Sequence, residues 1–84
     1  MERRVTLLYF AAIADLVRSR QEALTLPADV RDVRELYIYL EHTHPALLGR
    51  LAVVRCAVNE RFVDADHTLA DGDTVALIPP VSGG

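Results

Sequence analysis

One amphipathic helix, bounded at both ends and flanked by strand-like segments, does most to restrict the folds open to this chain. Asp32 is placed to cap its N-terminus, with Glu35 three residues further on, and the residue before Pro45 ends it. Between these bounds the apolar residues recur at helical spacing and form one stripe: Val33, Leu36, Tyr37 and Leu40. Because one stripe can cover one face of one sheet, we expect a single helix packed on a single sheet.

Five segments with the composition of β-strands surround this helix: residues 5–10, 22–26, 51–58, 61–63 and 74–78. The near-continuous apolar character of residues 51–58 suits a strand covered on both faces. A short helix is predicted after the first strand, because Ile13, Leu16 and Val17 recur at helical spacing, and residues 46–49 can add a further turn. This order predicts an α+β fold, with a mixed sheet packed on one principal helix.

Polar residues between the later strands are interpreted as turn residues. Asn59 and Glu60 form one turn, and Gly72 supplies a positive φ in a second turn, which carries a buried Leu69. Several side chains there are of types that also bind metals: Asp64, Asp66, His67, Asp71 and Asp73. Their spacing does not match a calcium loop, so we interpret the carboxylates as turn caps and predict no metal site.

Length and charge restrict the class of protein. With 84 residues, the chain is predicted to be one domain, residues 1–84, with one core. Its net charge of −3 gives no electrostatic footprint for nucleic acid. No apolar run reaches membrane length or resembles a signal peptide, so we expect a cytoplasmic protein that binds neither nucleic acid nor membrane. Cys56, the single cysteine, excludes an intrachain disulfide and is expected to be a buried structural thiol.

No set of side chains predicts a self-sufficient enzyme. The sequence contains no Ser-His-Asp arrangement, no glycine-rich phosphate loop and no paired catalytic carboxylates. His42 and His44 do not share a helix face, and a favourable interaction with the helix C-terminus explains them. Chemistry must therefore be sought at the C-terminal tail, residues 79–84.

The tail ends in Gly83 and Gly84, which leave the terminal carbonyl free of neighbouring side chains. A nucleotide or nucleophile can therefore approach that carbonyl closely. Pro79 and Pro80 stiffen the exit from the last strand, because proline fixes φ and cannot continue the ladder of hydrogen bonds. A stiff root with a slim tip suits insertion into a narrow cleft of a partner. Every basic residue is arginine, so the chain offers an activated tail no ε-amine of its own.

The C-terminal third resembles the small subunits of molybdopterin synthase, the sulfur carriers of molybdenum cofactor biosynthesis. The matching elements are Val58-Asn59, Asp66-His67, Leu69, Asp71-Gly72-Asp73-x-Val75 and Pro79-Pro80-Val81-Ser82-Gly83-Gly84. Tyr9-Phe10-Ala11, followed by a helix that ends at Leu16-Val17, is also similar to this family. Residues 18–50 match only in layout. The ending is the specific element, whereas other ubiquitin-like sulfur carriers share the Asp-Gly-Asp turn.

This resemblance implies a β-grasp (ubiquitin-like) fold and a mechanism centred on Gly84. A ubiquitin-activating-like adenylyltransferase would use ATP to convert the Gly84 carboxylate to an acyl-adenylate. A sulfur-donating protein would then supply the sulfur that displaces AMP and leaves a thiocarboxylate. The carrier itself would bind no cofactor. The large subunit would supply the catalytic groups that transfer the sulfur to a cyclic pyranopterin precursor, which forms the molybdopterin dithiolene.

The resemblance also implies an apolar docking patch, beside the tail, for the large subunit. By position this patch is assigned to Phe62 and Ile78, with Phe10 beside them, and it continues into the tail residues Pro79, Pro80, Val81 and Ser82. The expected assembly is a hetero-oligomer, specifically a heterotetramer. The alternative for Phe62 is that it completes the core, since phenylalanine is often buried.

Two alternative functions keep the activated tail. The carried sulfur could serve another pathway, such as thiazole formation, tRNA thiolation or cysteine synthesis. The chain could instead be a ubiquitin-like protein modifier, joined to lysines of target proteins through Gly84. The helix after the first strand and the Pro-Pro-Val-Ser-Gly-Gly ending favour the molybdopterin pathway over another sulfur pathway without excluding it, and the family resemblance favours it over a protein modifier.

Overall fold

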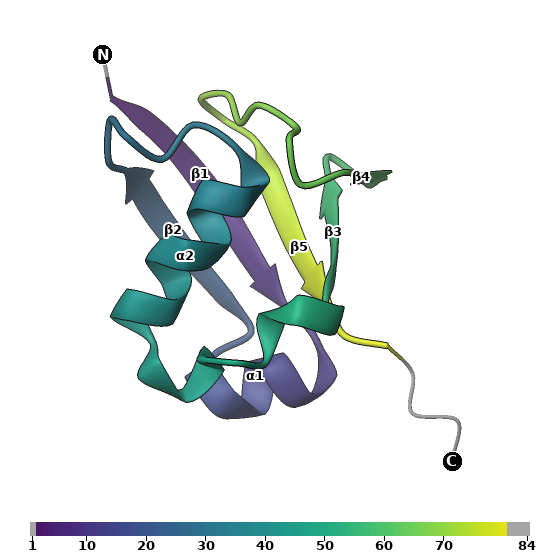
Figure 1. Ribbon diagram of the computed structural model, residues 1–84. Helices are drawn as coiled ribbons and strands as arrows, with labels where there is room; N and C mark the ends of the chain where they lie inside the picture. The colour runs from purple at the N-terminus through teal and green to yellow at the C-terminus, as the bar shows by residue number, and fades with distance from the viewer. Residues whose placement is uncertain (1, 81–84) are drawn as a thin grey trace.

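The computed structural model describes residues 2–80. Figure 1 shows helix α2 lying across one mixed sheet, with the short helix α1 at the end where the chain leaves β5. The elements in chain order are β1 (Arg3–Tyr9), α1 (Ala11–Val17), β2 (Gln21–Leu26), α2 (Val33–Thr43), the 3-10 turns η1 (Pro45–Leu47) and η2 (Leu51–Val53), β3 (Arg55–Val58), β4 (Arg61–Val63) and β5 (Thr74–Ile78). The predicted α+β fold with one principal helix is confirmed.

The five strands form one sheet in the order β2-β1-β5-β3-β4. Strand β1 pairs antiparallel with β2 and parallel with β5, whereas β3 pairs antiparallel with both β5 and β4. The first and last strands of the chain therefore lie side by side at the centre of the sheet.

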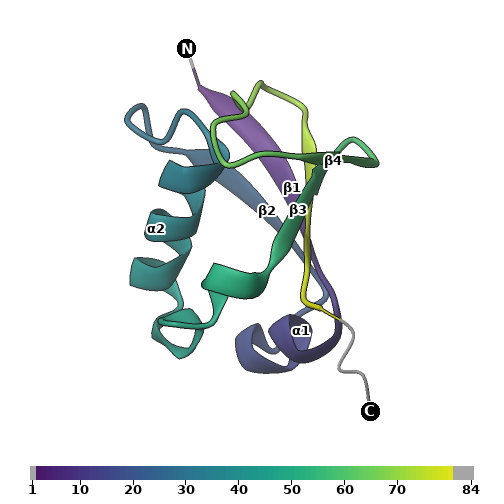
Figure 2. The same ribbon diagram turned by 45° about the vertical axis from the view of Figure 1, so that its right-hand side comes forward.

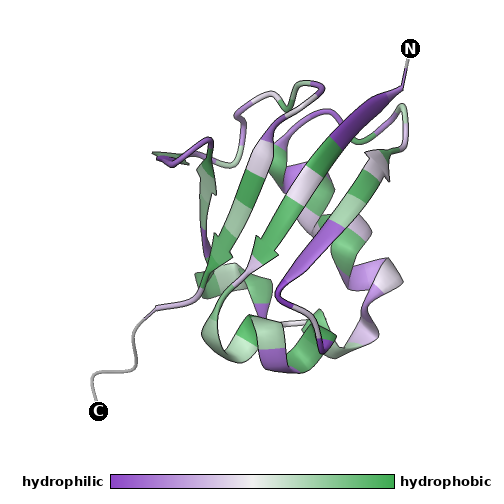
Figure 3. Ribbon diagram, turned by 180° about the vertical axis from the view of Figure 1, so that it is seen from behind, coloured by the Kyte–Doolittle hydropathy of each residue, from purple (hydrophilic) through white to green (hydrophobic). Residues whose placement is uncertain are grey.

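The core fills the space between α2 and one face of the sheet, and Figure 2 shows this separation into two layers. Its most deeply buried side chains are Leu7, Leu36, Leu40, Leu47, Leu69, Val75 and Leu77. Burial of each such leucine contributes about 1.5–3 kcal/mol to the hydrophobic stabilisation of the fold. Alternate residues of the strands point away from α2 and are only partly buried. Among the described residues no helix lies across this opposite face of the sheet (Figure 3).

Helix α2 begins at the predicted cap. The Asp32 carboxylate accepts a hydrogen bond of 2.9 Å from the Glu35 backbone N–H. The Glu35 carboxylate reaches back to the Arg31 backbone N–H at 2.8 Å, one residue beyond the partner that a capping box would use. At the other end His44 is the C-cap residue, and its N–H donates to the Leu40 carbonyl at 2.7 Å.

The predicted strand at residues 51–58 is wrong in its first half. Leu51–Val53 forms a 3-10 turn, and only Arg55–Val58 is a strand. The chain must change direction between α2 and the sheet, and a turn that buries Leu51 while Val53 stays exposed makes that change. The expectation of a strand covered on both faces holds for Cys56, Ala57 and Val58, which are all buried, whereas Arg55 at the start of the strand is exposed.

The predicted turns are confirmed. Asn59 and Glu60 both have positive φ, as a two-residue hairpin between β3 and β4 requires. Gly72 has φ +88°, and Leu69 is buried. The Asp73 carboxylate accepts hydrogen bonds from the Ala70 N–H at 2.8 Å and the Asn59 side-chain amide at 2.9 Å, so it ties the two turns together.

Asp71 has a similar structural role, because its carboxylate accepts from the Arg4 N–H at 2.7 Å. The turn-capping interpretation is thus confirmed for Asp73, whereas the Asp71 carboxylate ties its turn to the start of β1. Within residues 2–80 no helix is long and apolar enough to cross a membrane.

Candidate docking face at the root of the C-terminal tail

The face of the sheet opposite α2 carries a continuous group of apolar side chains. Figure 3 shows this face, with hydrophobic residues along β1 and β5 towards the end where the chain leaves the sheet. We define the open-face patch as Leu8, Phe10, Ala57, Phe62, Ala76 and Ile78, which line a shallow hollow of about 290 Å³ together with Glu60 and Thr74.

Strand register explains why these side chains lie together. Ala76 of β5 is opposite both Leu8 of β1 and Ala57 of β3, and Ala57 is in turn opposite Phe62 of β4. Paired residues point to the same face of a sheet, so one row of side chains crosses four strands. The two alanines leave the centre of the row low, and the aromatic rings of Phe10 and Phe62 stand at its two sides.

Phe62 does not belong to the core. Its side chain lies on the short edge strand β4 and is 56% exposed, so the core interpretation of this residue is wrong. Phe10 is 46% exposed and follows β1, where its N–H donates to the Leu77 carbonyl at 3.3 Å. Large exposed aromatic groups around one apolar hollow are typical of a surface that binds another protein.

The tail begins at one end of this patch. Ile78 is the last residue of β5, and Pro79 and Pro80 follow it outside the strand, half-buried and exposed respectively. The sheet thus ends where proline removes the backbone donor. The remaining predicted tail residues Val81, Ser82, Gly83 and Gly84 lie outside the described residues.

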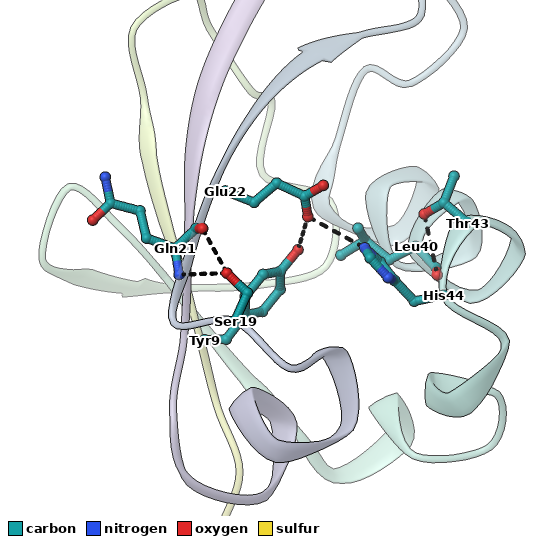
Figure 4. Close-up of polar contacts among 7 residues, drawn as sticks. All are labelled: Tyr9, Ser19, Gln21, Glu22, Leu40, Thr43 and His44. Atoms are coloured by element: carbon teal, nitrogen blue, oxygen red, sulfur yellow. Dashed lines mark hydrogen bonds and ion pairs between the residues drawn. The ribbon is translucent and has the colours of Figure 1, made fainter.

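A polar cluster of Tyr9, Glu22 and His44 lies on the helix side of the sheet. Tyr9 directly precedes Phe10 of the open-face patch. Figure 4 shows the Tyr9 hydroxyl donating to Glu22 Oε1 at 2.5 Å, and His44 Nε2 lying 3.2 Å from the same oxygen. The rings of Tyr9 and His44 meet edge to face with centroids 6.3 Å apart. Burial and the bond to Glu22 raise the pKa of the Tyr9 hydroxyl. His44 therefore joins α2 to β2, a contact beyond the helix C-terminus that its sequence position suggested.

The described residues offer binding groups and no activated nucleophile. Cys56 is buried, as predicted, and burial raises the pKa of its thiol to about 11, an effect that the Tyr37 hydroxyl partly opposes. A neutral thiol in the core is not a reactive group at pH 7. The open-face patch is thus a surface suited to binding a partner rather than a catalytic site.

The structure brings together on one face three residues that the sequence analysis assigned to the docking patch: Phe10, Phe62 and Ile78. Pro79 and Pro80 follow at the edge of this face. Sequence reasoning missed Leu8, Ala57 and Ala76, which form the floor of the hollow. It also missed Arg55, whose guanidinium lies 3.9 Å from the centroid of the Phe62 ring. The signal was present in part, because a two-residue turn at Asn59-Glu60 places Ala57 opposite Phe62.

Comparison with known proteins identifies the family. The model of the ThiS family matches residues 7–84. The chain belongs to the ThiS family. The human molybdopterin synthase sulfur carrier subunit is 32% identical over 96% of this chain and 94% of that protein. The subunit of the same name from Escherichia coli K12 is 35% identical over 95% of this chain and 99% of that protein.

Solved structures of related proteins have the same fold as this chain. One chain in the complex of subunits 1 and 2 of molybdopterin-converting factor from Helicobacter pylori is 30% identical, with a TM-score of 0.65 over 96% of this chain and 99% of that chain. Small archaeal modifier protein 1 of Haloferax volcanii is 25% identical, with a TM-score of 0.81 over 94% of this chain and 99% of that chain. The fold is the β-grasp (ubiquitin-like) fold that the sequence resemblance implied.

Proposed function

We propose that this ThiS-family chain is the sulfur carrier subunit of a molybdopterin synthase. The observation that carries the proposal is similarity over nearly the whole chain to proteins of that name from a human and a bacterial source. The open-face patch supports it, because an exposed apolar surface that leads to the tail fits a subunit that docks on a larger one.

Gly84 carries the chemistry in this proposal. Its carboxylate attacks the α-phosphorus of ATP in the active site of an adenylyltransferase, and pyrophosphate leaves. A persulfide sulfur of the donor then attacks the acyl carbon and AMP leaves; a thiol cleaves the S–S bond of the resulting acyl disulfide, which leaves a thiocarboxylate on Gly84. The thiocarboxylate sulfur finally attacks a carbon of the pyranopterin precursor and displaces an oxygen leaving group. Water then hydrolyses the resulting thioester, so Gly84 returns to a carboxylate and the sulfur stays on the precursor. Two loaded carriers thus supply the two sulfurs of one dithiolene.

The folded domain contributes position. Residues 79–84 span at most about 20 Å when extended, so a partner seated on the open-face patch can receive the tail in a cleft within that distance. Docking holds the reacting atom near its target and converts an encounter of two molecules into a reaction within one complex. The catalytic groups then belong to the large subunit, and the carrier is a donor rather than a catalyst.

The partner proposed for this patch is the large subunit of molybdopterin synthase. The Helicobacter pylori relative was solved as a complex of subunit 1 with subunit 2 of the molybdopterin-converting factor, and this supports the choice. A heterotetramer, the adenylyltransferase and the sulfur-donating protein complete the proposal, which places the carrier in the cytoplasm and gives it no bound cofactor.

Mass spectrometry of the intact chain tests the proposal. After incubation with the adenylyltransferase, ATP and a sulfur source, we expect the mass change of one oxygen replaced by sulfur, located at Gly84. Addition of the large subunit and precursor should remove that sulfur and yield molybdopterin. A loaded chain that transfers no sulfur to the precursor, and that does not restore molybdoenzyme activity in a strain lacking its own carrier, would assign the sulfur to another pathway.

A second candidate is a protein modifier, supported by the likeness to small archaeal modifier protein 1. It predicts isopeptide-linked species of higher mass on a denaturing gel after activation in a lysate. The chain contains no lysine, so such species could not include chains linked through its own ε-amines. Sulfur loading without any such conjugate favours the carrier.

A further inference from the structure

Arg55 stands over one of the two aromatic groups of the open-face patch. Its guanidinium carbon lies 3.9 Å from the centroid of the Phe62 ring, which is stacking distance. Strand register accounts for the contact, because Arg55 and Ala57 share a face of β3 and Ala57 is opposite Phe62. The charge is thus held against the side of an apolar surface.

Within residues 2–80 this guanidinium has no carboxylate partner within 4.0 Å, whereas Arg31 pairs with Glu35 at 3.3 Å. Arg55 is exposed, so its donors face water in the isolated domain. A guanidinium is weakly hydrated and planar, and it presents its N–H groups in a fixed fork that matches a carboxylate. Stacking on Phe62, a weak attraction at an exposed site, favours an orientation of that fork beside the open-face patch.

Arg55 lies at the end of the sheet from which the tail leaves. Arg55 is opposite Ile78, the last residue of β5, so it lies at the root of the tail. Gly84 follows Ile78 by six residues, so a partner can contact Arg55 at the sheet and still receive the tail in a cleft up to about 20 Å away. Glu60 borders the same hollow near the turn that joins β3 to β4, so the patch has a basic side at the tail root and an acidic residue elsewhere on its rim.

We propose that Arg55 is a specificity-determining residue of the docking surface, and that it pairs with an Asp or Glu side chain of the protein that covers the open-face patch. The proposal rests on the carrier function above and adds a requirement on the partner's charge. A partner that places an apolar group in the hollow and a carboxylate beside Phe62 would bury the ion pair. The buried pair would then contribute to the affinity and to the choice of partner. A partner with a basic group there would be rejected.

The test compares R55E, R55K and the control R61E in binding to the large subunit of the same organism. Arg61 is also exposed and carries the same charge directly after the turn, but it neighbours Phe62 in the strand and so points to the opposite face. R55E and R61E therefore change the net charge equally while only R55E changes the patch. Isothermal titration calorimetry at low and high NaCl gives each affinity, and thermal melting confirms that each variant is folded.

We expect R55E to raise the Kd about 30-fold or more, because it places like charges together in a buried contact. R55K should raise it about 10-fold, since lysine keeps the charge but loses the planar fork. R61E should stay within about threefold of the parent chain, because Arg61 points away from the open-face patch. Salt should weaken the parent complex and R61E more than R55E, because R55E lacks the ion pair that salt screens.

Equal effects of R55E and R61E, or an R55E affinity within about threefold of the parent, would overturn the role of Arg55 and leave the carrier function intact. If the parent chain itself does not bind the large subunit, the carrier function and the inference both fail. If R55E unfolds below the assay temperature, the Kd of R55K tests the role of Arg55 in its place.

Discussion

Phe62→Ala is expected to weaken partner binding far more than it weakens the fold. Phe62 is 56% exposed, so less than half of its surface is buried within the domain. Removing a fully buried phenylalanine costs about 3–5 kcal/mol, whereas here no enclosed cavity forms and the loss is about 1 kcal/mol of partial burial. The contact with Arg55 adds about 0.5–1 kcal/mol, as is usual for an exposed cation–π pair. The free energy of unfolding should therefore fall by about 1–2 kcal/mol.

Binding should respond differently, because a docked partner would bury the rest of the ring. A buried aromatic anchor at an interface costs about 2 kcal/mol or more on truncation, which is about 30-fold in Kd. Urea denaturation gives the first quantity, and calorimetric titration with the large subunit gives the second.

Ile38→Ala is the matched control for this comparison. Ile38 is 52% exposed, close to the value for Phe62, but it lies on α2 and not on the open-face patch. It should change the affinity by less than about threefold. Two results would refute the reasoning: a larger loss of folding free energy than of binding free energy for Phe62→Ala, or an equal loss of affinity in both variants.

Three further predictions concern the tail, the backbone and pH. Deleting Gly84 should abolish thiocarboxylate formation in the mass spectrum while the melting temperature stays unchanged; a large loss of thermal stability would contradict this. Ala11 has φ +50°, which costs a residue with a Cβ about 1–2 kcal/mol, so Ala11→Gly should raise the urea midpoint and Ala11→Val should lower it. Burial raises the pKa of Cys56 from 9.0 to about 11, so above about pH 9 the unfolded chain loses a proton that the folded chain keeps. Stability should therefore fall between pH 9 and pH 11, with a shallower fall in Cys56→Ala; equal slopes in urea titrations would show that this thiol does not contribute.

The sequence predicted the elements whose signals are local. Asp32 and Glu35 indicated the start of α2, and Gly72 indicated a turn with positive φ, because each signal lies within a few residues of its effect. The boundary at Val54 was missed, since an apolar run fits both a strand and a buried 3-10 turn. The change of direction that separates them depends on where α2 ends relative to the sheet.

Contacts between distant residues were the harder part of the site. Glu22 and His44 meet across 22 positions, and neither neighbourhood indicates the other. Arg55 and Phe62 lie closer in sequence, but their stacking depends on the pairing of β3 with β4. The hairpin turn fixes that pairing, and whether the ring then faces the core or water depends on which side α2 covers.

The parallel pairing of β1 with β5 has a mechanical consequence. Figure 1 shows that β1 begins at one end of this pair and that β5 ends at the other. A pull on the tail against a domain held near its N-terminus therefore loads the pair along the strands, in shear, and the bonds of the ladder share the force rather than opening one after another. The registered pairs from Thr6 with Thr74 to Tyr9 with Leu77 would have to yield together. For the sulfur carrier proposed above, this pairing would resist unfolding of the domain when the tail is pulled out of a partner's cleft.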